Sequence, residues 1–140
     1  MDQIFGDSSA PILVVMNRFR VPEHETAQFA EDSRVALAAL AESVGFIDGL
    51  IAASTDEADL RMITTRWVNV GSYRRALSRF EVKMSAIPIL SKAVDESSAY
   101  EAVHFIANGQ ASNLNSGRAA DADEIGLGHA SAPAVPPIRS

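Results

Sequence analysis

The sequence contains no cysteine. This absence excludes a disulfide framework, a thiolate metal site and a cysteine nucleophile. No apolar run approaches the roughly 18 residues that a membrane-spanning helix requires. The first ten residues, MDQIFGDSSA, lack the basic segment and the apolar segment of a signal peptide. We therefore expect a cytoplasmic protein that does not associate with membranes.

Basic residues are also in short supply, with 12 lysines and arginines against 18 acidic residues and a net charge of -6. The densest basic stretch comprises Arg74, Arg75, Arg79 and Lys83, whose spacing is typical of a solvated helix face. No basic cluster is long enough to mark a nucleic-acid surface. We expect no nucleic-acid partner.

The composition changes along the chain, and 140 residues suit one domain. We assign residues 11–106 to the folded domain and residues 1–10 to a flexible N-terminus. Residues 107–140 contain no aromatic residue and are rich in Ala, Gly, Ser, Asn, Asp and Pro. Such a composition buries too little apolar surface to order itself, so we expect a disordered tail. The alternative is that its EIGLGHA stretch docks another protein.

Hydrophobic periodicity within residues 11–106 predicts six main elements. We expect strands at residues 12–21, 46–55, 60–67 and 99–106, a helix at 23–44 with Gly45 just after its end, and a second helix from about 70. Asn69 or Ser72 is the expected cap of the second helix, with further helix on either side of Pro88. The order β-α-β-β-α-β predicts an α+β, ferredoxin-like fold with a four-stranded antiparallel sheet.

The first strand carries apolar residues on both faces and one polar exception. Asn17 has the same parity as Leu13, Val15, Phe19 and Val21, and the opposite parity carries Ile12, Val14 and Met16. Helices can cover only one face of the sheet, and a large exposed apolar face usually marks an interface. We therefore infer a homodimer whose sheets pack face to face.

Several short stretches resemble one known family. They are NRFRVP at the end of the first strand, Gly45-Phe46 after the long helix, TTRW at the end of the third strand, and WVNVGSYRRAL at the next turn. Residues 12–106 thereby resemble the antibiotic biosynthesis monooxygenase domain of the dimeric α+β barrel superfamily. The resemblance implies oxidation of flat aromatic or quinol-type molecules with O2 and no cofactor, or else haem binding and degradation.

The haem-degrading branch of that family uses three residues. Asn17 matches its first-strand asparagine. Its tryptophan position falls on or near Ala76, and its histidine position falls in the stretch from Lys83 to Ala86, which has no histidine. The resemblance therefore favours the oxygenase branch without haem, and leaves a haem-binding variant as an alternative.

Four residues are the candidate catalytic groups. Asn17 is either a donor to a substrate oxygen or to O2, or a core asparagine bonded to backbone. Trp67 either stacks on an aromatic ligand or packs under the second helix, and Tyr73 is a candidate proton donor. His104 is a candidate general base or a structural histidine.

Two apolar residues, Phe29 and Met84, are the candidate pocket lining. The remaining histidines, His24 and His129, are too far from His104 in the chain to form a metal motif, so we predict no metal site. A third hypothesis stays open beside the oxygenase and the haem variant. It is a non-catalytic dimeric module that binds a small ligand, or a protein through its tail.

Overall fold

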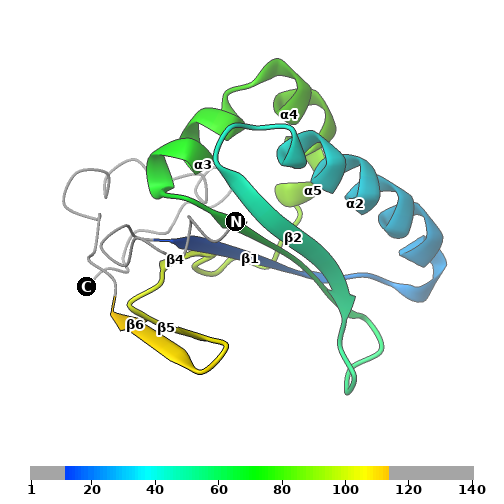
Figure 1. The fold of residues 1–140 in the computed structure, drawn as a ribbon. Helices are drawn as coiled ribbons and strands as arrows, with labels where there is room; N and C mark the ends of the chain where they lie inside the picture. Colours follow the sequence, from blue (N-terminus) through cyan, green and yellow to red (C-terminus); the bar gives the residue numbers. More distant parts are fainter. Residues whose placement is uncertain (1–11, 114–140) are drawn as a thin grey trace.

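A four-stranded antiparallel sheet in the order β2-β3-β1-β4 forms one layer of the computed structural model, which describes residues 12–113. The other layer consists of helices that all lie on one face of the sheet (Figure 1). The strands are β1 (Leu13–Arg20), β2 (Phe46–Ala53), β3 (Leu60–Trp67) and β4 (Ala99–Glu101), and the helices are η1 (Glu23–Glu25), α2 (Thr26–Ala41), α3 (Val70–Leu77), α4 (Phe80–Ser85) and α5 (Ile87–Leu90). The expected α+β, ferredoxin-like architecture is confirmed.

The register of the central strands follows from the apolar alternation of β1. Leu13 lies opposite Trp67 and Arg20 lies opposite Leu60, so β1 pairs with β3 along its whole length. Pro22 follows immediately and ends the strand, because proline cannot donate to a ladder. One face of β1 is buried under the helices through Val15 and Phe19.

Helix α2 ends earlier than the sequence suggests. Its last residue is Ala41 and its C-terminal cap is Glu42, so Gly45 lies in the following turn and not directly after the helix. Gly45 has φ +94°, a conformation that glycine adopts without steric cost. The expectation that Gly45 ends the helix was therefore wrong in position, although the positive φ that it supplies is real.

The second helical region is divided into three short helices. Asn69 caps α3 by accepting a hydrogen bond from the Ser72 backbone N–H at 2.9 Å, which selects Asn69 over Ser72 as the cap. Pro88 lies inside the first turn of α5, where its missing N–H costs nothing. Helix is present on either side of Pro88, as expected, with α4 before it and α5 continuing past it.

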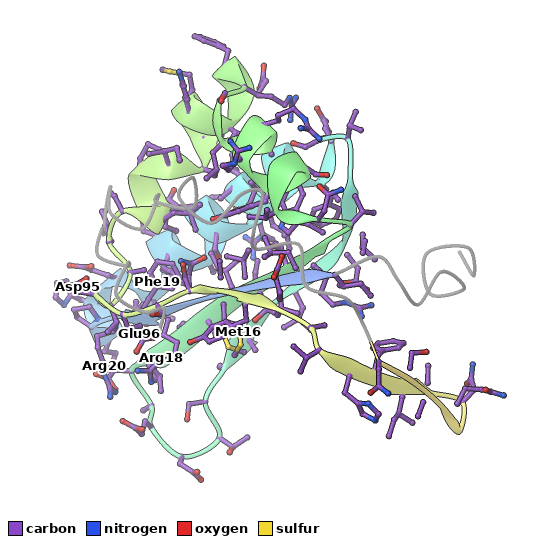
Figure 2. All side chains as sticks on the ribbon, turned by 90° about the vertical axis from the view of Figure 1, so that its left-hand side faces the viewer. Met16, Arg18, Phe19, Arg20, Asp95 and Glu96 are labelled. Atoms are coloured by element: carbon purple, nitrogen blue, oxygen red, sulfur yellow. The ribbon has the colours of Figure 1, made fainter. Side chains whose placement is uncertain are left out.

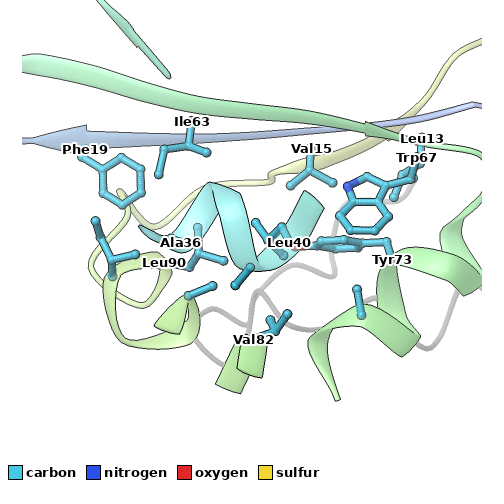
Figure 3. Packing of buried hydrophobic residues seen from close by; sticks show 14 of the residues in the cluster. Leu13, Val15, Phe19, Ala36, Leu40, Ile63, Trp67, Tyr73, Val82 and Leu90 are labelled. Carbon is cyan, nitrogen blue, oxygen red and sulfur yellow. The ribbon is translucent and has the colours of Figure 1, made fainter. Parts of the chain in front are cut away.

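The core fills the space between the sheet and α2, α3, α4 and α5 (Figure 3). Helix α2 contributes Ala36 and Leu40, which lie over the middle of β1 and β3. Val82 and Leu90 complete this layer from the shorter helices. Within residues 12–113, the other face of the sheet receives no helix.

The C-terminal part of the domain differs most from the expectation. The single strand expected over residues 99–106 is split into β4 and β5 (His104–Ala107), and β5 pairs with β6 (Gln110–Asn113) in a separate two-stranded sheet. Regular structure therefore continues past residue 107, where we expected the tail to begin. The predicted flexible N-terminus, His129 and the EIGLGHA stretch lie outside the described residues.

No helix within residues 12–113 has the length and hydropathy needed to span a membrane.

Candidate functional site

Asn17 occupies the middle of β1, opposite Ile63 of β3, and points to the same side as the buried Val15 and Phe19. The residue is partly buried. Its carboxamide forms no side-chain hydrogen bond with any of residues 12–113. The reading of Asn17 as a core asparagine bonded to nearby backbone therefore does not hold for this part of the chain. Two N–H donors and a carbonyl acceptor are left for water or a ligand.

The surroundings of Asn17 are apolar and aromatic. Phe19 is the next residue on the same face, and its ring centroid lies 5.1 Å from that of Phe29 on α2. The segment 94–98 runs along the other edge of β1, where the Val94 N–H donates to the Arg18 carbonyl at 2.8 Å. Of the predicted residues, Phe29 thus packs against Phe19, the residue that follows Asn17 on the helix-covered face of β1.

Trp67 and Tyr73 lie together at the other end (Figure 3). The Trp67 ring is fully buried, meets Phe46 edge-on at 5.3 Å and lies 5.4 Å from Tyr73. Its indole N–H donates to Thr65 Oγ1 at 2.8 Å. Trp67 pairs with Leu13, four residues from Asn17, which corresponds to about 13 Å along a strand. The geometry of Trp67 is therefore that of a packed core residue with its N–H satisfied.

The Tyr73 hydroxyl is buried, and burial raises its pKa above the ordinary value for tyrosine. The hydroxyl therefore stays protonated at neutral pH. In this state it is able to donate a hydrogen bond but not to accept a proton as a base.

Two predicted residues lie away from Asn17. His104 is exposed on β5, and its Nδ1 lies 2.6 Å from Asn113 Oδ1. The side chain of Met84 is 61% exposed on α4. Met84 therefore faces solvent, contrary to the expectation that it lines a pocket.

A haem group is not supported by the residues at the family's haem positions. Ala76, at the tryptophan position, is buried in the core. The stretch from Lys83 to Ala86, at the histidine position, lies on and just after α4 and contains no histidine. Within residues 12–113 there is also no group of three His, Cys, Asp or Glu side chains that could hold a metal ion.

The uncovered face of the sheet carries two forked ion pairs that sequence reasoning missed. Arg18 Nε and Nη2 donate to the two carboxylate oxygens of Glu96, both at 2.7 Å (Figure 2). Arg66 donates in the same way to Asp48 at 2.9 and 2.7 Å. These hydrogen bonds hold the pKa of Glu96 and of Asp48 below the usual range. Arg66 is thus engaged within the chain.

Most of the rest of this face is apolar, apart from Thr64 and from Arg20, which forms ion pairs with Glu57 and Asp59. Leu50 and Tyr100 are 53% and 52% exposed, and Met16 lies beside Thr64 between them. Figure 1 shows that the helices cover only the opposite face. We define the apolar sheet face as Val14, Met16, Leu50, Met62 and Tyr100.

Comparison with known proteins gives a match in structure but not in sequence. No family model matches the chain, and no curated protein matches its sequence. SnoaB from Streptomyces nogalater, described as a cofactor-independent oxygenase, superposes with a TM-score of 0.57 at 15% identity over 73% of this chain and 100% of its own. A candidate antibiotic biosynthesis monooxygenase from Deinococcus radiodurans gives 0.57 at 18% identity over 68% and 96%. A conserved protein from Methanosarcina mazei gives 0.56 at 16% identity over 70% and 96%. The chain has the fold of the antibiotic biosynthesis monooxygenases.

Proposed function

We propose that this protein is a cofactor-independent oxygenase that oxidises a flat aromatic or quinol-type molecule with O2. The observation that carries the proposal is Asn17, a partly buried carboxamide on the same face of β1 as the buried Val15 and Phe19, which has no hydrogen-bond partner among residues 12–113. The likeness in fold to SnoaB, described as a cofactor-independent oxygenase, supports it.

The reaction proceeds through an electron-rich anion of the substrate. The protein has to supply only a hydrogen-bond donor and apolar surroundings. An activated ring CH2 of an anthrone, or a hydroxyl of a hydroquinone, loses a proton to solvent, and the delocalised anion passes electrons to O2. In an anthrone one oxygen atom enters the ring as a carbonyl and the other leaves as water, so CH2 and O2 become C=O and H2O. In a hydroquinone a ring C–H becomes C–OH, the two ring hydroxyls become carbonyls, and the second oxygen atom again leaves as water. Asn17 would donate its N–H to the substrate oxygen on which the negative charge gathers, and the apolar surroundings would strengthen that hydrogen bond.

The other two candidate residues that carry a titratable group, Tyr73 and His104, do not supply a base beside Asn17. Tyr73 is held neutral by burial, and His104 lies on the β5–β6 hairpin beyond the end of β4. Neither is positioned as a base beside Asn17. We therefore propose substrates acidic enough to ionise on binding, such as anthrones and hydroquinones.

Asn17→Ala is expected to lower kcat for O2 consumption about a hundredfold, the usual effect of removing one oxyanion donor. The measurement is O2 uptake with a panel of anthrones and hydroquinones. Phe80→Ala is the control, because Phe80 is exposed on α4. Equal rates for Asn17→Ala and the unmodified protein would contradict the role of Asn17. No uptake by the unmodified protein across the panel would favour the non-catalytic module.

We also propose that the protein forms a homodimer through the apolar sheet face. That face is apolar at its centre, and its two forked ion pairs are already satisfied within one chain. A second copy could therefore cover the face without leaving a charge unpaired, which would otherwise be costly.

Leu50→Asp is expected to convert the dimer to a monomer, because it places an unpaired charge on the apolar sheet face, where the second copy would cover it. Light scattering is the measurement, with a mass of two chains expected for the unmodified protein and of one chain for the variant. Val44→Asp is the control, since Val44 is also apolar and is more exposed, at 89%, but lies in the turn between α2 and β2 and outside the apolar sheet face. A mass of one chain for the unmodified protein would contradict the dimer.

A further inference from the structure

Helix α4 carries two large apolar side chains on its outer face. Its inner face packs into the core through Val82 and the following Ala86, which are both fully buried. Phe80 and Met84 lie one helical turn apart on the other side and are 73% and 61% exposed. An aromatic ring beside a methionine is typical of a binding surface, because both offer apolar area and methionine adapts its shape. The pair is therefore a candidate docking surface.

The surface around this pair is basic, although the chain as a whole is acidic. The stretch RRALSRFEVK contains four basic residues and one acidic residue, Glu81, whereas the net charge of the chain is -6. Arg75 on α3 and Lys83 on α4 are exposed, and neither forms an ion pair with another of residues 12–113. We define the docking face as Arg75, Phe80, Lys83 and Met84. Its occupant should combine negative charge with apolar side chains.

One segment of the chain itself has this composition. The stretch DADEIGL, residues 121–127, carries three carboxylates followed by Ile125 and Leu127, and it has no basic residue. The order matches that of the docking face, where a basic residue on α3 precedes the apolar pair on α4. Laid along the face in the same direction, the segment brings its carboxylates to the cations and its aliphatic side chains to the apolar pair.

The spacing on the two sides also agrees. In an extended segment the two aliphatic side chains point to the same side about 7 Å apart, and residues one turn apart on a helix lie about 6 Å apart. One of them can therefore cover Phe80 while the other covers Met84. Asp121 then lies about 13 Å further back, toward α3, where the guanidinium of Arg75 lies beside Gly71.

The segment also begins close enough to reach this face. Asn113, the last described residue, lies opposite His104 in the hairpin, three residues after β4 ends at Glu101. Glu101 lies opposite Leu13, and Leu13 lies opposite Trp67, just before α3. Asn113 is therefore at the end of the sheet where α3 begins. The twelve residues that lead from there to the aliphatic part of the segment extend to about 40 Å, whereas a domain of this size is about 33 Å across.

We propose that residues 121–127 dock on this face of their own chain, with their carboxylates beside its two cations and their aliphatic side chains on Phe80 and Met84. The face belongs to the helical layer, so an occupied face leaves the apolar sheet face uncovered (Figure 1). The inference is therefore independent of the proposed dimer and of the oxygenase activity. The entropy lost when the segment is ordered offsets most of the contact energy, so docking changes the free energy of unfolding little and needs a local probe.

Disulfide formation between introduced cysteines is such a probe, because the chain has no cysteine of its own. In the full-length double variant Glu81→Cys and Gly126→Cys, one cysteine lies beside Phe80 and the other in the middle of the segment. Under mild oxidation we expect an intrachain disulfide about tenfold faster than in the control Glu31→Cys and Gly126→Cys, because docking raises the effective concentration. Glu31 is the matched control, since it is also an exposed helical glutamate but lies on α2.

Charge reversal tests which groups hold the segment. Adding Asp121→Lys and Asp123→Lys to the fast variant should lower its rate to that of the control. Further addition of Arg75→Glu and Lys83→Glu should restore most of the fast rate, since the charges are then complementary again. A rate that does not respond to the first pair of reversals would overturn the role of the carboxylates.

Three other results would overturn the proposal. Equal rates for the Glu81→Cys and Glu31→Cys variants would show that the segment has no preference for α4. Two chains joined by the disulfide as the main product would exclude docking within one chain. If Gln3→Cys in place of Gly126→Cys forms the disulfide with Glu81→Cys faster, the occupant of the face is the N-terminal segment.

Discussion

Trp67→Ala is expected to lower the free energy of unfolding by about 3–5 kcal/mol, as for other large aromatic residues removed from a core. The indole is fully buried, and its loss would leave a cavity between β3 and α3. Two aromatic contacts, to Phe46 and Tyr73, would disappear with it. The Thr65 hydroxyl would lose its 2.8 Å partner, which adds a cost of its own.

Urea unfolding followed by far-UV circular dichroism is the appropriate measurement, because Trp67 is the only tryptophan and its fluorescence is lost in the variant. Phe80→Ala is the control for removing an aromatic side chain, and at this exposed site we expect a change within about 0.5 kcal/mol. A comparable loss in the two variants would contradict the assignment of Trp67 to the core. If Trp67 instead lined an open pocket, the loss would be much smaller than predicted.

The fold was largely predictable, because the alternation of apolar residues and the residues that end or cap strands and helices determine secondary structure through neighbours in the sequence. The parity of β1 placed Asn17 on the helix-covered face, Pro22 ended the strand, and Asn69 was one of the two predicted caps of α3. The pattern did not show how far apart residues of different strands lie when they face the same core. Asn17 and Trp67 face the same core, but Asn17 lies in the middle of β1 and Trp67 at the end of β3, and this separation depends on the register between the two strands.

The β5–β6 hairpin was missed although its signal is present in the sequence. Asn108-Gly109 is a strong hairpin turn, and both residues have positive φ, 54° and 80°. Most of β5 was included in the expected strand 99–106, whereas β6 is short and polar, so composition placed it in the tail. The break between β4 and β5 had no such signal, because where a strand leaves a sheet depends on the packing around it.

The candidate site was harder to predict, because its residues are defined by contacts between distant segments. Asp48 engages Arg66 across two neighbouring strands, and Glu96 engages Arg18 from a loop 78 residues later. Neither pairing is visible in spacing along the chain. Met84 was wrongly predicted to line a pocket for a similar reason. Helical periodicity alone did not show which side of α4 faces the core, and Met84 is exposed.

Gly45→Ala is expected to lower the free energy of unfolding by about 2–5 kcal/mol, through backbone strain and overpacking together. At φ +94°, any side chain is strained. An added Cβ would also lie 2.3 Å from Ser72 Oγ and 2.4 Å from Ser72 Cβ, so Ser72 would have to move. Ser72 donates to Asn69 through both its backbone N–H and its hydroxyl, and a displaced Ser72 therefore weakens the cap of α3.

Gly71→Ala is the matched control for this last prediction. Gly71 lies in the first turn of α3 without a positive φ, and an added Cβ would first meet the end of the flexible Arg75 side chain at 3.2 Å. Alanine is the better helix former by about 1 kcal/mol, so this variant should be neutral or slightly more stable. If urea unfolding shows that Gly45→Ala lowers the free energy of unfolding and Gly71→Ala raises it, the close packing of the turn after α2 against the cap of α3 is confirmed. A loss at Gly71 equal to that at Gly45 would instead show that any added methyl group disturbs α3, and that the positive φ of Gly45 contributes little.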